Sequence, residues 1–259
     1  MQNSTDMVRA RLHLGAVLPR IAEVAARDKA AQDIIRGWNM VTQFQLPGGD
    51  PATALIFKDG KLTAQPGDYG GAKVTLTFPD APTLNAVFQG KSKQQPRPSV
   101  NAVFHASKLK KLDGLLARLD YYLRPSAEML KDPEQFAFVV ELTLTVLTCG
   151  LKYVGENDRE ARPVVAHMPE GTLEIRVPGG PTTHIEHRAG KFNPAKGSAA
   201  RPNAILELRD MDTAWRMLQN KVDFFAAVGL GEVRLKGSIA LLDPISLLMD
   251  RLDIYLNPK

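Results

Sequence analysis

The feature that most constrains the fold is an internal repeat, in which the second half of the chain repeats the landmarks of the first half in order. Residues 42–49, which end in Leu-Pro-Gly-Gly, recur as residues 173–180, which end in Val-Pro-Gly-Gly. Both stretches alternate polar and apolar residues before Pro-Gly-Gly, a pattern typical of a strand that enters a turn. Two such units in 259 residues predict two tandem domains of one fold.

Further landmarks keep a nearly constant separation. Lys-Asp-Gly-Lys at 58–61 corresponds to Arg-Ala-Gly-Lys at 188–191, and each stretch has the composition of a tight hairpin turn. A third strand is predicted at 73–78 and, 130 residues later, at 203–208. Asp80 and Asp210 are then expected to cap short helices that run to Lys91 and Lys221. In the closing helix, residues 115–123 and 248–256, the separation grows to 133.

Each unit is also predicted to begin with a long helix. In the first copy apolar residues recur at helical spacing: Val17, Ile21, Val24 and Ala25, followed by Ile34, Ile35 and Trp38. In the second copy the stretch 136–151 has both helical spacing and a local alternation that would suit a strand. Its place in the repeat favours a helix. The predicted domains are residues 1–126 and 127–259, each with a helix, three strands, a short helix, one or two further strands and a closing helix.

Charge and cysteine content narrow the class of protein. Lys and Arg outnumber Asp and Glu by 33 to 28, a balance that mildly favours anionic partners such as a membrane surface. The densest basic stretch, Lys108, Lys110 and Lys111, has no interleaved aromatic residues, so we expect a solvated helix face and no nucleic-acid partner. The single cysteine, Cys149, excludes an internal disulfide and fits a reducing, cytoplasmic location.

Neither a targeting segment nor a membrane-spanning helix is predicted. The N-terminal apolar stretch is interrupted by Arg20, which does not suit the core of a signal peptide. The most apolar segment, residues 136–151, contains Glu141 and is shorter than the roughly 20 residues that a spanning helix needs.

The sequence contains only weak evidence for a catalytic or a metal site. His184 and His187 stand three apart in a predicted strand, so their side chains should point to opposite faces. No Gly-x-Ser-x-Gly motif occurs. Gly229 and Gly231 resemble the start of a dinucleotide fingerprint, but Arg234 replaces its third glycine, and glycines of a hairpin explain the pair better. Asp120 and Asp253 recur beside Arg118 and Arg251, where we expect helix-surface ion pairs. We therefore predict no enzyme, no metal and no cofactor.

The ordered set of features in the second copy carries a family resemblance. An acidic residue and a Thr open the short helix, an Asn-Lys turn and a small-residue segment follow, and then come a Gly-x5-Gly stretch, read as a hairpin, and a Leu-rich helix. This pattern resembles the sterol carrier protein type-2 family, well over residues 171–255 and in outline over 42–122. The resemblance implies an α+β fold in each domain, a roughly five-stranded, mostly antiparallel sheet covered by helices. It also implies an apolar tunnel for a fatty acyl, sterol or isoprenoid-type lipid.

Bulky apolar residues of the second copy lie in the region that the family uses for its ligand. Such residues can line a binding cavity, although each could equally be part of the core. The predicted ligand-binding residues are Trp215, Met217, Leu218, Phe224, Phe225, Val228, Leu247, Leu248 and Met249. The first copy departs from the pattern in the region 92–105, because residues 92–99 contain two prolines where the second copy has a paired strand.

The sequence thus predicts a cytoplasmic lipid carrier that docks transiently on anionic membranes. The alternative is a non-catalytic accessory or scaffold subunit of an enzyme of lipid or quinone synthesis, a role that family members are known to have. A third hypothesis is an enzyme that acts on a bound lipid. It requires a pair of polar groups with perturbed protonation, and the sequence indicates no such pair. The oligomeric state is left open.

Overall fold

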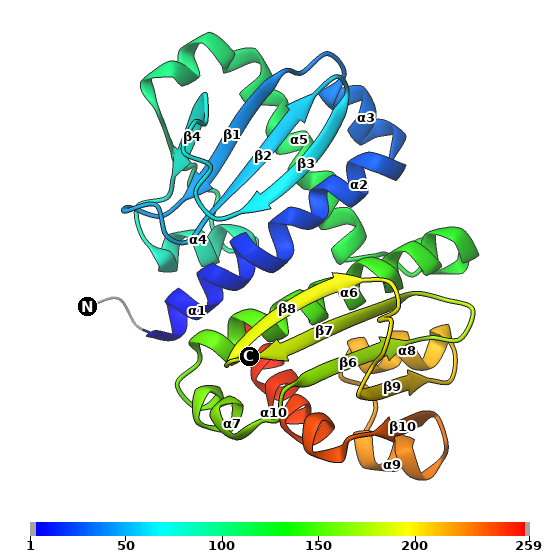
Figure 1. Cartoon of the computed structure of the whole chain (residues 1–259). Coiled ribbons are helices and arrows are strands. Elements are labelled where there is room, and N and C mark those ends of the chain that lie inside the picture. The colour runs from blue at the N-terminus through cyan, green and yellow to red at the C-terminus, as the bar shows by residue number, and fades with distance from the viewer. Residues whose placement is uncertain (1–3, 257–259) are drawn as a thin grey trace. The chain divides into compact units, whose positions relative to one another are not determined.

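The computed structural model describes residues 4–256 and divides into two compact units, Met1–Arg124 (unit 1) and Pro125–Lys259 (unit 2) (Figure 1). The boundary predicted between residues 126 and 127 lies two residues from this division. The predicted domains also include residues 1–3 and 257–259, which lie outside the described residues.

Unit 1 consists of a helical N-terminal segment, a sheet and a closing helix. In chain order its elements are α1 (Ser4–Leu12), a π-helical turn (His13–Val17), a 3-10 turn (Leu18–Arg20), α2 (Ile21–Arg27), α3 (Lys29–Ile35), β1 (Met40–Gln45), β2 (Ala52–Lys58), β3 (Lys61–Pro66), β4 (Val74–Thr77), α4 (Ala81–Phe88), β5 (Arg97–Pro98), a 3-10 turn (Val100–His105) and α5 (Ala106–Leu123).

Unit 2 has the same order of strands and of the main helices, but it has the short helix α9 before its last strand, and no 3-10 turn between that strand and the closing helix. Its elements are a 3-10 turn (Met129–Lys131), α6 (Pro133–Asn157), α7 (Ala161–His167), β6 (Gly171–Arg176), β7 (Thr182–Arg188), β8 (Lys191–Lys196), β9 (Ala204–Leu208), α8 (Met211–Leu218), α9 (Phe224–Gly229), β10 (Val233–Gly237) and α10 (Ile239–Leu256).

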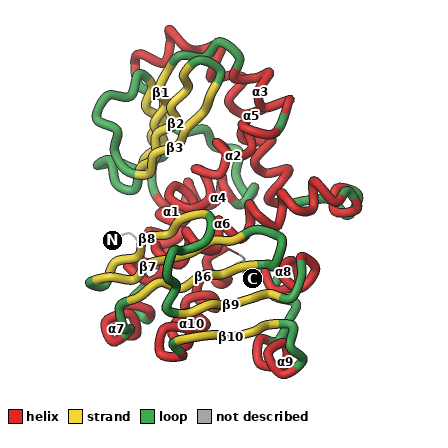
Figure 2. The backbone as a smooth tube through the Cα atoms, turned by 45° about the vertical axis from the view of Figure 1, so that its right-hand side comes forward, coloured by secondary structure: helices red, strands yellow, loops and turns green. Residues whose placement is uncertain are grey.

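Each unit contains one five-stranded sheet, in the order β3-β2-β1-β4-β5 in unit 1 and β10-β9-β6-β7-β8 in unit 2. Only β1 with β4, and β6 with β9, run parallel, and the other pairings are antiparallel. Figure 2 shows the strands of each sheet with the helices around them. The predicted α+β class, with a five-stranded, mostly antiparallel sheet in each half, is confirmed.

Several details of the prediction are wrong. The strand predicted as the third of each copy is the fourth, because the hairpin at Lys61 and Lys191 contributes two strands and not one. No hairpin follows α8, because α9 occupies that position and β10 pairs with β9. In unit 1 the proline-containing segment does pair with the sheet, but over two residues only, Arg97 and Pro98.

The two leading helical segments also differ from each other. In unit 2, α6 is one continuous helix, as its place in the repeat predicted. In unit 1 the corresponding segment changes to a π-helical turn at His13–Val17 and to a 3-10 turn at Pro19, and α3 begins after a break at Asp28. A proline inside a helix removes a backbone hydrogen bond, which explains the irregularity before α2. Trp38 lies beyond the end of α3.

A buried carboxylate clamps the closing helix to the leading helix in each unit. In unit 2, Asp158 accepts hydrogen bonds from Arg251 Nη2 at 2.7 Å and from the Tyr255 hydroxyl at 2.5 Å, and it caps α7 through the backbone N–H of Ala161 at 2.7 Å. Together these hydrogen bonds outweigh the cost of burying the carboxylate, so the pKa of Asp158 is lowered, and the pKa of Tyr255 is raised to about 12, mainly by burial.

Unit 1 repeats this clamp with Asp28, which accepts from Arg118 Nη2 at 2.6 Å and from the Tyr122 hydroxyl at 3.0 Å. The predicted helix-surface ion pair is found for Asp120, but its partner is Arg124, at 3.1 Å. The arginine of each clamp instead reaches a buried aspartate at the end of the leading helix, about 90 residues earlier in the chain.

One described helix, α6, is long and apolar enough to cross a membrane, but 61% of its most apolar window is buried inside the protein. Its buried residues include Val139, Leu144 and Leu151. This burial is typical of the core helix of a globular domain.

Candidate functional site

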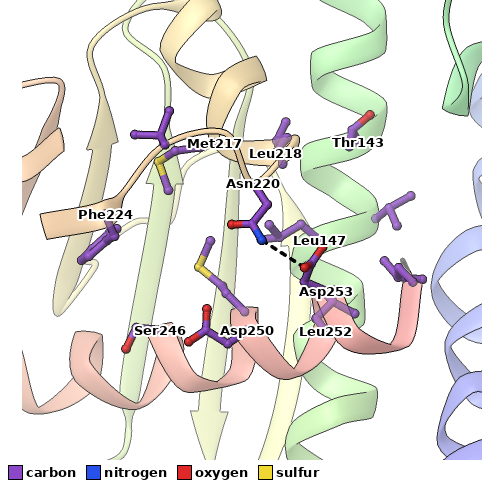
Figure 3. Close-up of a pocket in the computed structure, with 14 residues that line it drawn as sticks. Thr143, Leu147, Met217, Leu218, Asn220, Phe224, Ser246, Asp250, Leu252 and Asp253 are labelled. Carbon is purple, nitrogen blue, oxygen red and sulfur yellow. Dashed lines mark hydrogen bonds between the residues drawn. The ribbon is translucent and has the colours of Figure 1, made fainter. Parts of the chain in front are cut away.

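A cavity of about 150 Å³ lies in unit 2 between α6, α10 and the segment formed by α8, α9 and their connection (Figure 3). Most of its lining is apolar: Val146, Leu147, Met217, Leu218, Val222, Phe224, Met249, Leu252 and Leu256. An engineered apolar cavity of about this volume accepts a benzene ring. The cavity is therefore large enough for part of an apolar molecule.

A second, smaller cavity of about 10 Å³ extends toward the sheet. Leu147, Met217, Leu218 and Met249 line both cavities, and the strand residues of the smaller one are Ile175, Leu206 and Leu208. Methionine side chains are flexible and adapt to irregular spaces. Met217 and Met249 are therefore the adaptable side chains between the two cavities.

Polar groups gather on the α10 side of the larger cavity. Asn220 Nδ2 donates to Asp253 Oδ2 at 3.0 Å, as Figure 3 shows. Asn220 has a positive φ of 51°, which asparagine tolerates better than most residues. Asp250 lies on the same side, almost one helical turn before Asp253. Among the described residues that line the cavity, none is Lys, Arg or His, so the local charge of the lining is negative.

Four of the nine predicted ligand-binding residues line this cavity: Met217, Leu218, Phe224 and Met249. The other five do not. Leu248 is fully buried in the core, and Phe225 is 84% exposed. Trp215 packs edge-on against Phe136, with ring centroids 6.4 Å apart, whereas Val228 and Leu247 are half-buried outside the lining.

The structure also places residues in the cavity that the sequence reasoning did not name as site residues. Thr143, Val146 and Leu147 come from one face of α6, and Ser246, Asp250, Asp253 and Leu256 come from one face of α10. Both sets follow helical spacing. The face of α10 that contains Met249 could therefore have been extended to its polar neighbours from the sequence alone.

Unit 1 has larger side chains at two corresponding positions. His13 and Phe88 precede Thr143 and Leu218 of the cavity lining by 130 residues. Their rings stack, with centroids 5.0 Å apart and an interplanar angle of 23°. His13 is buried, and burial together with the charges of Arg9 and Arg124 lowers its pKa to about 3. By the offset of the repeat, unit 1 thus has two stacked rings where unit 2 has threonine and leucine.

The opposite face of the unit 2 sheet is charged. Glu174, Arg176 and Glu207 alternate along β6 and β9 with the apolar residues that face the helices. Arg176 Nη2 donates to Glu207 Oε2 at 2.7 Å, and Lys236 Nζ donates to the same oxygen at 3.0 Å. These two cations lower the pKa of Glu207. The apolar cavity is thus confined to the helix-covered face.

The two histidines of the His-x-x-His pattern are held by separate backbone carbonyls. His184 Nδ1 lies 2.8 Å from the Gly197 oxygen, and His187 Nδ1 lies 3.0 Å from the Pro169 oxygen. His187 is buried against Phe192. Within residues 4–256, no group of three or more His, Cys, Asp or Glu side chains could hold a metal ion.

Comparison with known proteins gives structural matches only. No protein-family model matches the chain, and no curated protein matches its sequence significantly. A sterol carrier protein domain 2 of Helicoverpa armigera is similar in structure, with a TM-score of 0.34 and 17% identity, over 47% of this chain and 91% of that one.

Two other solved structures are similar over a comparable length. A UbiJ-SCP2 ubiquinone synthesis protein has a TM-score of 0.31 and 12% identity, over 41% of this chain and 96% of that one. A sterol carrier protein 2 has a TM-score of 0.30 and 23% identity, over 39% of this chain and 88% of that one. These similar structures are domains of the family that the sequence resembles, and each matches less than half of this chain.

Proposed function

We propose that unit 2 binds one apolar, lipid-like molecule in the cavity between α6, α8 and α10 and carries it without changing it chemically. The observation that supports this function is the cavity itself, a mostly apolar space with a few polar groups, which include the two carboxylates of α10. Ligand sites commonly combine an apolar lining with a few polar groups that orient the ligand.

The size of the cavity sets a condition on binding. A volume of about 150 Å³ holds part of a lipid, so a whole lipid requires Met217 and Met249 to move and open the space toward the sheet. Methionine has three rotatable bonds and is common at binding surfaces that adapt to different ligands. The ligand would then extend from α10 toward Ile175 and Leu206.

The polar side of the cavity suggests which lipids bind best. A carboxylate head group beside Asp250 and Asp253 would bring like charges together, because no cation lines the cavity in the described residues. An uncharged hydroxyl could instead donate a hydrogen bond to either aspartate. We therefore propose that the ligand has a neutral or cationic head group.

A titration with two ligands of equal chain length tests the proposed function and this preference together. Hexadecanol and hexadecanoic acid are added separately to the full chain, and native mass spectrometry measures the bound fraction. We expect one adduct per chain and tighter binding of the alcohol by roughly fivefold or more, equivalent to about 1 kcal/mol. D250N/D253N should remove this difference. Absence of any adduct with either ligand would refute the carrier function.

A second candidate function is the accessory or scaffold subunit. Phe225, in the first turn of α9, and Leu230, directly after its end, are 84% and 74% exposed and could receive a partner protein. The two functions differ in what the isolated chain does, because a scaffold binds no lipid when its partner is absent. The titration above therefore separates them. Cytoplasmic location and the absence of catalysis are parts of the proposal, and recovery of the bound lipid unchanged would support the latter.

A further inference from the structure

A basic segment of unit 1 presents exposed apolar side chains outside the proposed carrier domain. Between residues 91 and 111 there is no Asp or Glu, whereas six residues are Lys or Arg: Lys91, Lys93, Arg97, Lys108, Lys110 and Lys111. Within the same segment Val100, Val103 and Phe104 are 88%, 76% and 85% exposed. These are the three most exposed of the large apolar residues in the described part of unit 1.

The segment is fixed to the sheet and is not a loose loop. Ser99 N donates to the Thr75 oxygen at 2.8 Å, and Thr75 N donates to Ser99 Oγ at 3.1 Å. Ala102, in the middle of the 3-10 turn, is buried. Because the turn is anchored at these points, Val100, Val103 and Phe104 are exposed by the geometry of the turn.

The charged residues that flank this apolar tip in sequence, Lys and Arg, have one sign. Arg97 lies three residues before Val100, and Lys108, Lys110 and Lys111 lie in the first turns of α5, which begins directly after the tip. The neighbouring strand β4 contributes uncharged residues, Val74–Thr77. The first acidic residue of α5 is Asp113. A cationic surface around apolar side chains is complementary to an anionic bilayer, in which apolar groups enter the acyl region and cations contact head groups.

We propose that residues 97–111 of unit 1 form a docking surface for anionic lipid bilayers. Val103 and Phe104 insert into the interface of the bilayer, and Arg97 and the three lysines bind the lipid phosphates. The sequence predicted transient docking on anionic membranes, and this proposal locates the docking surface in unit 1. The proposal does not depend on a ligand in unit 2, because it concerns residues of unit 1 alone.

Unit 2 supplies a matched control. Its corresponding segment also exposes apolar side chains, Phe225 and Leu230, but it contains the acidic residues Asp223 and Glu232. Glu232 is itself paired with Arg209 and Arg216, at 3.1 Å each. Exposure of apolar residues is thus shared by both segments, and the uninterrupted positive charge belongs to the unit 1 segment only.

The test is sedimentation of the full chain with vesicles of phosphatidylcholine alone or mixed with an equal amount of phosphatidylglycerol. We expect binding to the mixed vesicles that weakens with added salt, and little binding to the neutral ones. V103E/F104E should lower the partition coefficient at least tenfold. K108Q/K110Q/K111Q should lower it by about 100-fold, since each cation near an anionic surface contributes about fivefold.

F225E is the control and should leave vesicle binding unchanged, because acidic residues interrupt the positive charge of the unit 2 segment that contains Phe225. Circular dichroism of each variant checks that unit 1 is folded. Equal binding of wild type and V103E/F104E, or a loss caused by F225E instead, would overturn the proposal. Failure of the wild type to bind the mixed vesicles would also overturn it, in favour of a protein partner for this surface. None of these results depends on lipid binding by unit 2.

Discussion

Removing the Tyr255 hydroxyl should destabilise unit 2 specifically. Tyr255 is buried, and its hydroxyl donates to Asp158 at 2.5 Å. In Y255F the ring remains, and Asp158 retains Arg251 and the N–H groups of Glu160 and Ala161. Only one hydrogen bond to a buried carboxylate is lost. Such a bond contributes about 1.5–3 kcal/mol to the free energy of unfolding.

The two tryptophans allow each unit to be followed separately. Trp38 lies in unit 1 and Trp215 in unit 2, and the chain has no others. In a W38F background, urea unfolding followed by fluorescence therefore reports unit 2. We expect Y255F to lower the free energy of unfolding by about 2 kcal/mol without changing the slope of the unfolding curve. The melting temperature of unit 2 should fall by roughly 6–10 °C.

Two control variants define what would refute this reasoning. Y122F removes the equivalent hydroxyl in unit 1, so it should destabilise the transition reported by Trp38 and leave that of Trp215 unchanged. Y121F alters a half-exposed neighbour whose ring stacks on Arg118 at 4.3 Å, and it should change the stability of either unit by less than about 0.5 kcal/mol. If Y255F had no larger effect than Y121F, the clamp would not stabilise unit 2.

Two further predictions concern the cavity and its counterpart in unit 1. F224E should abolish binding of hexadecanol, because Phe224 lines the cavity, whereas F225E should leave binding within about twofold, because Phe225 is 84% exposed; equal losses would place the ligand elsewhere. H13L should remove a pH dependence from the stability of unit 1. The folded-state pKa of His13, about 3, lies below the unfolded value of about 6.5, so the unfolded chain binds a proton that the folded chain does not. Stability of the wild type should therefore fall as the pH drops from 6.5 toward 3, by up to about 1.4 kcal/mol per pH unit. Urea titrations at pH 7 and pH 5 in a W215F background measure the difference, and an H13L curve as steep as that of the wild type would contradict it.

The architecture could be predicted from the sequence because the repeat supplied two examples of each element. Pro-Gly-Gly turns, glycine hairpins and the capping aspartates Asp80 and Asp210 are local signals, and the structure places each of them where it was expected. The helix α6 is a case in which position in the repeat correctly decided between a strand and a helix.

Features that depend on tertiary packing could not be predicted from the sequence. The Asp158 clamp joins residues more than 90 positions apart, and the local sequence instead favoured pairing of Arg251 with Asp253, two residues further along the chain. Likewise, Phe224 and Phe225 are adjacent and chemically identical, but only Phe224 faces the cavity. Orientation in a helix as short as α9 is set by packing against its neighbours, and six residues contain too few turns to show a periodicity.

The measurement that tests the central claim most directly is native mass spectrometry of the freshly purified full chain, followed by extraction and identification of any bound molecule. The matched variant is T143H/L218F, which introduces at the cavity the two side chains that stack in unit 1. We predict one apolar adduct per wild-type chain, with a head group that carries no negative charge, and none on the variant. Equal adducts on both proteins, or an unmodified mass for the wild type even after incubation with hexadecanol and sterols, would contradict the account.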